Sequence, residues 1–368
     1  MVYLDHNATT PLDDRVLEAM LPFLKSFYGN PSALYRIGRL SRSAIETARE
    51  QVAALVGVSP GQVVFTSGGT ESNNLALNSI KSHTRLLISS IEHPSVTEPV
   101  ERLRNRSCSV DILTVNENGI FDRESFERCC AKRPNFASLI LANNETGVIQ
   151  SIAEWAGMLR EQGTIVHTDA VQAAGKMPLA FNALNVQLMS ISGHKIYGPK
   201  GSGALIVEKG TEPEPLQLGG GQEQGFRAGT ENVAAIVGFG KAAELALAEM
   251  SQWRNQMLDL RQLLEQGLAE LNATIFSQAV ERLPNTVQFG IDGVDGEMLL
   301  MQLDKKGFAV SSGSACASGG GMPSPVLTAM GVARDLAKSA LRVSLGKANT
   351  EADITDFVKC LKTILNRT

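Results

Sequence analysis

The sequence lacks the cysteine patterns that mark metal sites and disulfide frameworks. It contains five cysteines, an odd number, with no CxxC pair and no histidine at metal-ligand spacing. We therefore expect neither disulfides nor a metal site. Cys316 lies among glycines and serines in SSGSACASGGGMPSP (311–325), which indicates an exposed, mobile loop. The others lie in helical or strand-edge sequence, where cysteine commonly serves as a small buried hydrophobe: Cys108, Cys129, Cys130 and Cys360.

Long apolar runs and blocks of one charge are also absent. No uninterrupted apolar stretch approaches the roughly 18–20 residues of a membrane span. The opening MVYLDHNATTP has neither the basic nor the apolar region of a signal peptide. The formal net charge is −4 and no Lys/Arg run stands out, so nothing favours nucleic-acid binding. We expect a cytoplasmic protein with no membrane partner and no direct nucleic-acid partner.

No internal repeat divides the chain, so its organisation must come from hydrophobic periodicity. Two amphipathic helical patterns open it, the second ending at Gly57, and strand-like runs then alternate with helical segments up to about residue 207. This alternation predicts an α/β fold with a largely parallel sheet flanked by helices. A long helical pattern runs from Glu231 to about Leu271, and shorter strands and helices after it indicate a smaller α+β lobe. The length of 368 residues also favours two lobes.

Lys195 and Asp169 together predict a cofactor site. Lys195 lies in SGHKIYGPKG (192–201), and Asp169 ends the strand-like run TIVHTDA (164–170). A lysine amine can form a Schiff base with an aldehyde cofactor, and a buried carboxylate can keep the pyridine nitrogen of that cofactor protonated. Sites in α/β sheets lie at the carboxyl ends of strands, as Asp169 does. Either residue alone could belong to an ordinary turn, but the pair predicts pyridoxal 5′-phosphate chemistry on an amino acid.

A glycine turn enters a helix after a strand at VVFTSGGTESNNLAL (63–77). The backbone N–H groups there, with Gly69 and the Thr70 hydroxyl, could cradle a phosphate, or Thr70 and Glu71 could simply cap the helix. The segment does not match the P-loop pattern GxxxxGK[ST]. With Lys195 and Asp169 present, the phosphate of a cofactor is the better interpretation.

A set of short motifs covers nearly the whole chain. They are LDHNATTP (4–11), GNPSA (29–33), FTSGGTESNNLAL (65–77), EHPSV (92–96), NNETGVIQ (143–150), HTDAVQAAGK (167–176), SGHKIYGPKG (192–201), GGGQEQGFRAGTEN (219–232), SSGSACAS (311–318) and LRVSLG (341–346). In order and spacing this set resembles the NifS/IscS-type cysteine desulfurases of the class-V, pyridoxal-phosphate-dependent aminotransferase family. The resemblance implies an enzyme that converts L-cysteine to L-alanine and carries the sulfur as a persulfide on Cys316.

The resemblance also implies the architecture. It predicts a fold-type-I, aspartate aminotransferase-like α/β homodimer. The large cofactor-binding domain would comprise residues 12–250, with a mainly parallel sheet. The small α+β domain would comprise residues 1–11 and 251–368 and would carry the catalytic cysteine loop.

Individual roles follow from the same resemblance. Lys195 would be the Schiff-base lysine, Asp169 the partner of the pyridinium nitrogen and Gln172 the donor to the phenolate oxygen. His93 would stack on the ring and could act as an acid or base, although a surface-loop histidine is the alternative. The remaining cofactor ligands would be Gly69, Thr70, Ser192, His194, Asn144 beside the ring, and Thr230 from the second subunit.

Arg342 of LRVSLG resembles the arginine that binds the substrate carboxylate, assisted by Asn144, because a planar guanidinium suits bidentate recognition. Without the resemblance, Arg342 would be a strand-end surface arginine. His167 is more typical of a buried strand histidine, and the role of His6 stays open.

The chain differs from the family at two places. The run ASGGGMPSP after Cys316 is more glycine-rich than in many members, which affects loop order and acceptor docking. The chain also ends at Thr368, where some members extend further to hold an iron–sulfur scaffold, so we expect that docking mode to be absent or reduced.

Two other hypotheses stay open at this point. Another class-V enzyme, such as a selenocysteine lyase or an aminotransferase, would share Lys195 and Asp169 but would not need Cys316. A catalytically idle module of a sulfur-relay complex would not need this residue set. The expected partners are L-cysteine, a second subunit, and a sulfur-acceptor protein serving iron–sulfur assembly or thiolation of tRNA or other targets.

Overall fold

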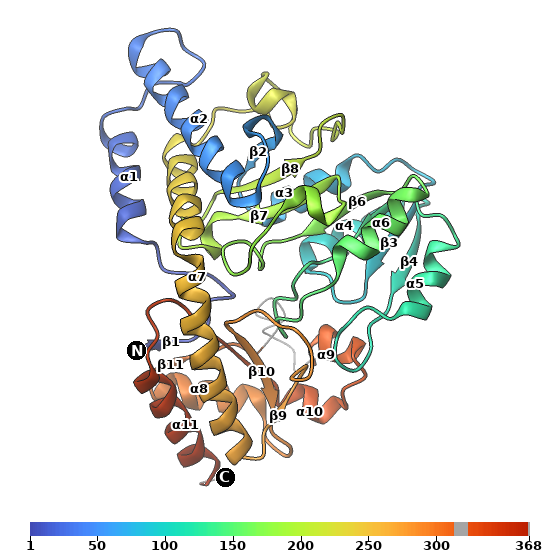
Figure 1. Ribbon diagram of the computed structural model, residues 1–368, viewed down its shortest axis with the longest axis vertical. Coiled ribbons are helices and arrows are strands. Elements are labelled where there is room, and N and C mark those ends of the chain that lie inside the picture. Colours follow the sequence, from blue (N-terminus) through green and yellow to red (C-terminus); the bar gives the residue numbers. More distant parts are fainter. Residues whose placement is uncertain (313–322, 367–368) are drawn as a thin grey trace.

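A seven-stranded sheet forms the centre of the molecule in the computed structural model, which describes residues 1–312 and 323–366. Its strand order is β2-β8-β7-β6-β5-β3-β4 (Figure 1). Neighbouring strands from β7 to β4 pair in parallel, whereas β8 runs antiparallel to both β7 and β2. This confirms the largely parallel sheet predicted from the alternation. The strands are β2 (Val63–Thr66), β3 (Arg85–Ser89), β4 (Ser109–Leu113), β5 (Phe136–Ser138), β6 (Ile165–Asp169), β7 (Leu188–Ser192) and β8 (Gly203–Val207).

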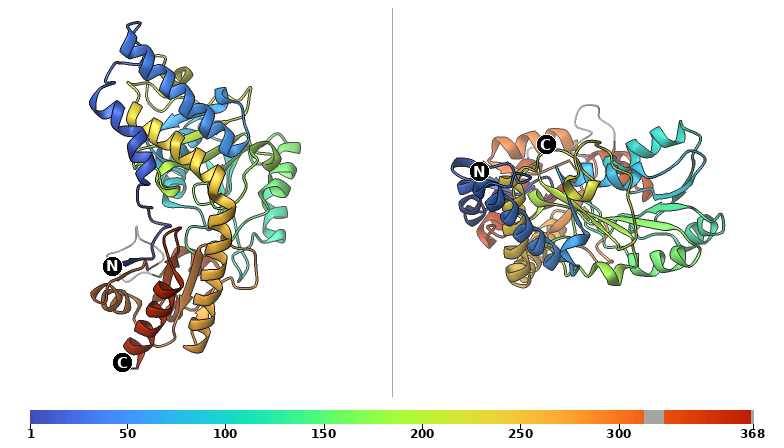
Figure 2. Two further views of the ribbon diagram at one scale, coloured as in Figure 1. Left: turned by 60° about the vertical axis from the view of Figure 1, so that its left-hand side comes forward. Right: turned by 90° about the horizontal axis from the view of Figure 1, so that it is seen from above.

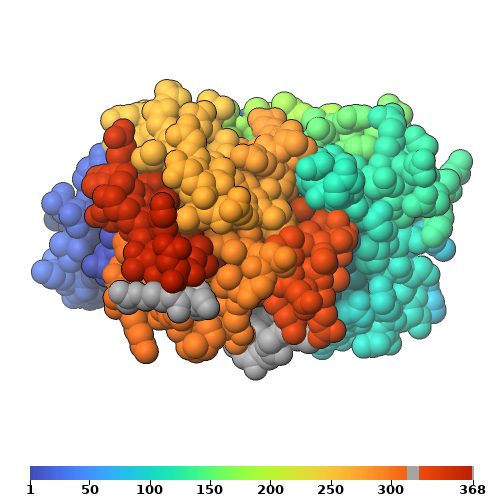
Figure 3. Space-filling view, turned by 90° about the horizontal axis from the view of Figure 1, so that it is seen from below, coloured from blue at the N-terminus to red at the C-terminus, as the bar shows by residue number. Residues whose placement is uncertain are grey.

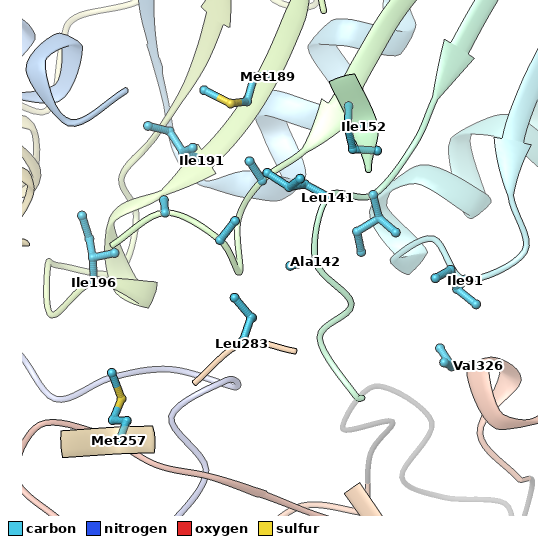
Figure 4. Close-up of a cluster of buried hydrophobic side chains, with 14 of the residues drawn as sticks. Ile91, Leu141, Ala142, Ile152, Met189, Ile191, Ile196, Met257, Leu283 and Val326 are labelled. Atoms are coloured by element: carbon cyan, nitrogen blue, oxygen red, sulfur yellow. The ribbon is translucent and has the colours of Figure 1, made fainter. Parts of the chain in front are cut away.

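Helices cover both faces of this sheet. Alternate residues of each strand point to opposite faces, so the buried side chains of the strands fall into two clusters. Val64 and Leu205 belong to one buried cluster with residues of α3 and α4, whereas Val63 and Ile206 belong to a second with residues of α2, α6 and α7. Figure 4 shows part of the second cluster, with Met189 and Ile191 of β7. The helices are α1 (Asp14–Lys25), α2 (Arg36–Val56), α3 (Gly69–Asn78), α4 (Pro94–Arg104), α5 (Arg123–Cys130), α6 (Ile152–Glu161) and α7 (Val233–Glu270).

The two long helices α2 and α7 match the helical patterns in the sequence. Gly57 closes α2 in the left-handed conformation with φ 70°, and its backbone N–H donates to the last turn, as expected of a C-terminal glycine. The helices approach closely at Gly240, where a Cβ atom would lie 2.5 Å from Cα of Ala48. Any larger residue at position 240 would push the two helices apart.

The C-terminal part of the chain forms two small sheets joined by helices. One sheet has the antiparallel order β12-β10-β9, and the other pairs β1 in parallel with β11 (Figures 1 and 2). Helix α11 lies beside the end of α7 in the view from below (Figure 3). The elements are β1 (Val2–Tyr3), β9 (Thr274–Ile275), β10 (Thr286–Gly290), α8 (Gly296–Lys305), β11 (Phe308–Ala309), α9 (Pro325–Ala329), α10 (Arg334–Lys338), β12 (Leu341–Ser344) and α11 (Glu351–Leu365).

The N-terminal segment lies with the C-terminal part of the chain, and Asp5 extends this association by a parallel bridge to Ser344. The predicted boundary near residue 250 would fall inside α7, which passes between the two parts in Figure 1. The division into residues 12–250 and residues 1–11 with 251–368 stays a prediction. Among the described residues, no helix combines the length and apolar character that crossing a membrane requires.

One of the strand-like runs that precede residue 207 in the sequence is longer than the strand in the structure. The run SLILA (138–142) belongs to β5 only through Ser138, and Ala142 makes an isolated antiparallel bridge with Ile149. After Ser138 the N–H groups of Leu139 and Leu141 still donate to carbonyls of β6, so the backbone stays beside that strand. On the other side the N–H of Ile140 donates to the side chain of Glu92, and the pairing with β3 stops at Ser138. The apolar run indicates burial correctly, but not where the strand ends.

Candidate active site

A pocket of about 610 Å³ opens where the carboxyl ends of several sheet strands face the C-terminal part of the chain. Asp169 ends β6, Ser192 ends β7, and His93 follows β3 after a short turn. Arg342 reaches the pocket from β12, and the N-terminal residues Asn7 and Ala8 also line it. The location agrees with the rule that sites in α/β sheets lie beyond the carboxyl ends of strands.

The carboxylate of Asp169 is buried and held from two sides. Its Oδ1 atom accepts a hydrogen bond from the backbone N–H of Val171 at 2.9 Å, and its Oδ2 atom accepts from Nδ2 of Asn73 at 2.7 Å. Asn73 lies on α3, so this helix fixes the carboxylate from the neighbouring layer. Hydrogen bonds to an ionised carboxylate stabilise its charged form. Asp169 is therefore set up to face a cation in the pocket.

The amine of Lys195 is held by the N-terminal segment. Its Nζ atom donates to the backbone carbonyl of Ala8 at 2.8 Å and to that of Asn7. The side chain of Asn7 in turn donates to the carbonyl of Asn144 at 3.1 Å and to Oγ1 of Thr286 at 2.9 Å. Asn7 thus ties the position of the lysine amine to strand β10, a link that the sequence motifs do not reveal.

The side-chain amide of Gln172 has a defined orientation. Its Nε2 atom donates to the carbonyl of Asn7 at 2.9 Å, and its Oε1 atom accepts from Nζ of Lys176 at 2.7 Å. Lys176 also donates to Oδ1 of Asn7 at 2.9 Å. Burial, with the nearby charges of Lys195 and Arg342, places the pKa of Lys176 well below its ordinary value. The amine of Lys176 keeps N–H donors whether it is charged or neutral, so it can hold Oε1 of Gln172 in both protonation states. Nε2 of Gln172 therefore faces Asn7 in both.

His93 caps the start of α4 with its own ring. Its Nδ1 atom lies 3.1 Å from the backbone N–H of Ser95 and 2.7 Å from Oγ of the same residue. Burial lowers the pKa of His93, while Asp169 raises it and Lys195 lowers it further. The ring is half-buried and lines the pocket, which disfavours the alternative of a surface-loop histidine.

The start of α3 gives the pocket wall a place to receive an anion. Helix α3 begins at Gly69 with no capping side chain at Gly68, whose φ of 154° and ψ of −179° are open essentially to glycine alone. A Cβ atom at Gly69 would lie 2.7 Å from Cγ2 of Val171, so glycine keeps this helix start open. Thr70, Ser192 and His194 also line the pocket. Burial, then the charge of Lys195, lowers the pKa of His194 to about 4, so its imidazole is neutral at physiological pH.

Arg342 lines the pocket and is almost fully buried. Its Nη2 atom lies 2.6 Å from Oδ1 of Asp5, and its Nη1 atom donates to the carbonyl of Asn144 at 2.9 Å. An incoming carboxylate would therefore meet a guanidinium whose orientation is already fixed. Burial excludes the reading of Arg342 as a strand-end surface arginine.

One predicted site residue is not assembled with the others in the single chain, and another falls outside the part of the chain that the structure describes. Thr230 is exposed and does not line this pocket of the single chain. Cys316 lies outside the described residues. His167 is a buried strand histidine, as expected, with its ring nitrogens 2.9 Å from Oγ of Ser138 and Oγ of Ser190. His6 is buried beside Gly346 and does not line the pocket.

Two buried carboxyls in the pocket wall were not predicted from the sequence. Glu92 accepts from the backbone N–H of Ile140 at 2.7 Å, and burial raises its pKa to about 8. Glu145 accepts from Nε2 of Gln288 at 3.1 Å, and burial raises its pKa as well. Their positions inside the motifs EHPSV and NNETGVIQ are the signal that could have found them.

Comparison with known proteins identifies the family. The class-V aminotransferase model matches residues 2–357. The chain belongs to this family. It is 41% identical to the cysteine desulfurase IscS of Dictyoglomus turgidum, covering 100% of this chain and 95% of that one. A cysteine desulfurase of Nostoc is also 41% identical, with 100% and 93% covered.

Solved structures of the family have the same fold. A NifS-like protein aligns with a TM-score of 0.94 at 38% identity, over 100% of both chains. A structure of SspA in complex with cysteine aligns with a TM-score of 0.83 at 32% identity, over 95% of this chain and 100% of that one. The chain therefore has the fold-type-I architecture of pyridoxal-phosphate-dependent transferases, as predicted.

The family is pyridoxal-phosphate-dependent, and the pocket residues fit that cofactor. Oγ of Ser192 is buried and has no hydrogen-bond partner within residues 1–312 and 323–366, so it is available to a phosphate. The uncapped start of α3 supplies backbone N–H groups beside it. Asp169 and Lys195 stand in the same pocket as this anion site, as a pyridine nitrogen and an aldehyde group require.

Proposed function

We propose that this chain is a cysteine desulfurase that converts L-cysteine to L-alanine and passes the sulfur to an acceptor through a persulfide on Cys316. The convergence of Lys195, Asp169 and Arg342 on one pocket carries the proposal. These groups supply an amine for an aldehyde cofactor, an anion for a pyridinium and a cation for an α-carboxylate. The cysteine desulfurases at 41% identity over the whole chain support the same activity.

Pyridoxal phosphate, when bound, supplies an electron sink next to Cα of the amino acid. Asp169 would hold the ring nitrogen of the cofactor, with Asn73 and the Val171 N–H keeping the carboxylate in place. Ser192, His194 and the start of α3 would hold its phosphate. Lys195 would anchor the cofactor in the resting enzyme and, once released, remove the Cα proton of the substrate with Nζ.

The substrate carboxylate would bind to Arg342, with Asn144 beside it. Because Asp5 already fixes the guanidinium, little side-chain entropy is lost when the substrate binds. This anchor would direct the thiol of the bound cysteine away from the carboxylate.

Sulfur transfer requires a thiolate, which we assign to Cys316. The Cys316 sulfur would form a bond to the substrate sulfur while the C–S bond breaks. The electron pair of that bond stays with Cβ, which takes up a proton and gives alanine. Cysteine and a protein thiol thus become alanine and a protein persulfide, with no external oxidant or reductant.

We propose that the enzyme is a homodimer in which Thr230 completes the phosphate site of the partner subunit. Thr230 is exposed on the single chain and stands outside its own pocket, as a ligand provided in trans would. Sedimentation of a fully active monomer would contradict this proposal.

We propose a protein acceptor for the sulfur, either an iron–sulfur scaffold or a thiolation factor, and the cytoplasm as the location. The free cysteines among the described residues suit a reducing compartment: Cys108, Cys129, Cys130 and Cys360. Transfer of radiolabelled sulfur from cysteine to purified candidate acceptors would show which class is used. Failure with every protein acceptor would contradict a relay.

The activity is tested by following alanine release from L-cysteine by wild-type enzyme and by Lys195→Ala. The wild type should release alanine, and the variant should lose both turnover and the visible absorbance of the anchored cofactor. Lys209→Met, at an exposed position, is a matched control that should keep both. A keto acid product in place of alanine would favour an aminotransferase, and wild-type turnover by Lys195→Ala would refute the role of this lysine.

A further inference from the structure

Four side chains beside the pocket form a continuous hydrogen-bonded row. Nδ2 of Asn73 lies 2.7 Å from Oδ2 of Asp169 and 2.8 Å from Oγ of Ser95. Oγ of Ser95 lies 2.7 Å from Nδ1 of His93. Asp169, Asn73 and Ser95 are all buried, so water does not compete for these contacts. The row joins Asp169 to His93, and all four residues line the pocket.

The protons in this row can be placed from the chemistry of its ends. A carboxylate only accepts, so the atom of Asn73 that faces Asp169 must be the amide nitrogen. The two N–H bonds of that nitrogen then serve Asp169 and Ser95. Oγ of Ser95 accepts one of them, which leaves its own proton for Nδ1 of His93.

A second donor reaches the same ring nitrogen. The backbone N–H of Ser95 points to Nδ1 of His93 at 3.1 Å. A nitrogen that faces two donors must offer its lone pair, and a proton on Nδ1 would meet both of them. Nε2 is then the ring nitrogen that carries the proton and remains for the pocket.

We propose that Asn73 and Ser95 are positioning residues that hold His93 as the neutral tautomer with its proton on Nε2. This tautomer would make His93 a hydrogen-bond donor to the bound cofactor and substrate, a role that rests on the proposed function. Nε2 has no lone pair to accept a proton in this tautomer. Removal of the Cα proton is therefore left to Lys195.

The surrounding charges do not reverse this arrangement. Asp169 favours a charged imidazole, whereas Lys195 and burial oppose it, and burial dominates. Glu92, Glu98, Glu145, His194 and Arg342 line the same pocket. Burial raises the pKa of Glu92 to about 8, so this carboxyl provides little negative charge to draw a proton onto His93. Burial raises the pKa of Glu145 as well.

The tautomer can be observed directly by nitrogen NMR of histidine-labelled protein, with and without pyridoxal phosphate. The chain has five histidines, so the signals of His93 can be assigned with a His93→Gln variant. We expect the proton on Nε2 of His93 at neutral pH, with Nδ1 unprotonated. A proton on Nδ1 of the wild type would overturn the proposal, whatever the activity of the enzyme.

Substitution of Ser95 tests how the tautomer is held. Ser95→Ala removes one donor to Nδ1, so the titration of His93 should move up by roughly half to one pH unit. The acid limb of kcat/KM should shift in the same direction, whereas Ser95→Thr keeps the hydroxyl and should restore both. Unchanged His93 signals in Ser95→Ala would overturn the role of Ser95.

A matched control is Ser138→Ala, which removes a serine hydroxyl from the ring of another histidine, the fully buried His167. It should move the signals of His167 and leave the tautomer of His93 unchanged. A tautomer change at His93 in this control would show that the response is not specific and would contradict the proposal. If the chain does not desulfurate cysteine at all, the proposed function fails while the NMR result still decides the tautomer.

Discussion

Nζ of Lys176 lies 2.7 Å from Oε1 of Gln172, and this contact determines which end of the glutamine amide faces Asn7 and the pocket. Lys176 has no direct place in the proposed chemistry. Its effect is to occupy the oxygen of Gln172, so that the N–H donors of the amide face the other way. A buried lysine four residues along the chain thus orients a residue predicted to bind the cofactor.

Lys176→Met should disturb this orientation while keeping the volume of the side chain. We expect a loss of about 2 kcal/mol in the free energy of unfolding, because two buried acceptors lose their donor. The pH titration of the visible absorbance of bound pyridoxal phosphate should shift as well, since Gln172 is predicted to donate to its phenolate oxygen. Lys209→Met is the exposed control, and identical spectra and stabilities for both variants would refute the role of Lys176.

Arg49 and Glu223 form a buried two-contact ion pair, with Nη2–Oε1 and Nη1–Oε2 distances of 2.7 and 2.8 Å. Removing one partner should cost about 3–5 kcal/mol, because a buried charge loses its counter-ion. Denaturation of Arg49→Met and of Glu223→Met should each show this loss in the free energy of unfolding. The double variant should lose less than the sum of the losses in the two single variants.

The exposed pair Arg123–Glu127 is the matched control, and its disruption should change stability by less than about 1 kcal/mol. Additive costs at Arg49 and Glu223 would contradict a coupled pair. The result also bears on the site, because Glu223 precedes Thr230 in the connection between β8 and α7.

Glu92 should make stability depend on pH. Its pKa is raised from 4.5 to about 8 in the folded protein, so the native state holds a proton that the unfolded chain releases between these values. Stability should therefore fall as pH rises through this window, by on the order of 5 kcal/mol from this group. Glu92→Gln mimics the protonated form and should flatten that part of the profile. An unchanged profile in denaturation at pH 5 and pH 8 would refute the assignment.

The main elements of the fold could be predicted because their patterns are long and regular. The helices α2 and α7 end within two residues of where glycine and periodicity place them. Strand β1 was missed, because two residues carry no periodic signal and its partner β11 lies about 300 residues away in the chain. Pairings of such long range depend on the tertiary fold.

The candidate site could be predicted in part. Lys195 and Asp169 stand out because Asp169 ends one strand and Lys195 closely follows another, and the structure places both in one pocket. The sequence did not predict the roles of Asn73, Ser95 and Lys176, because nothing in their local sequence shows which side chains they contact. Hydrogen-bond networks between layers of a fold are visible only once the layers are assembled.

The central claim is that Cys316 takes the sulfur of L-cysteine, and peptide mass spectrometry after brief treatment with L-cysteine tests it most directly. Burial raises the pKa of the Cys129, Cys130 and Cys360 thiols, which disfavours the thiolate form needed for attack. We predict one added sulfur atom on the peptide containing Cys316, and no alanine release by Cys316→Ser. Added sulfur on Cys108, Cys129, Cys130 or Cys360, with Cys316→Ser fully active, would contradict the account.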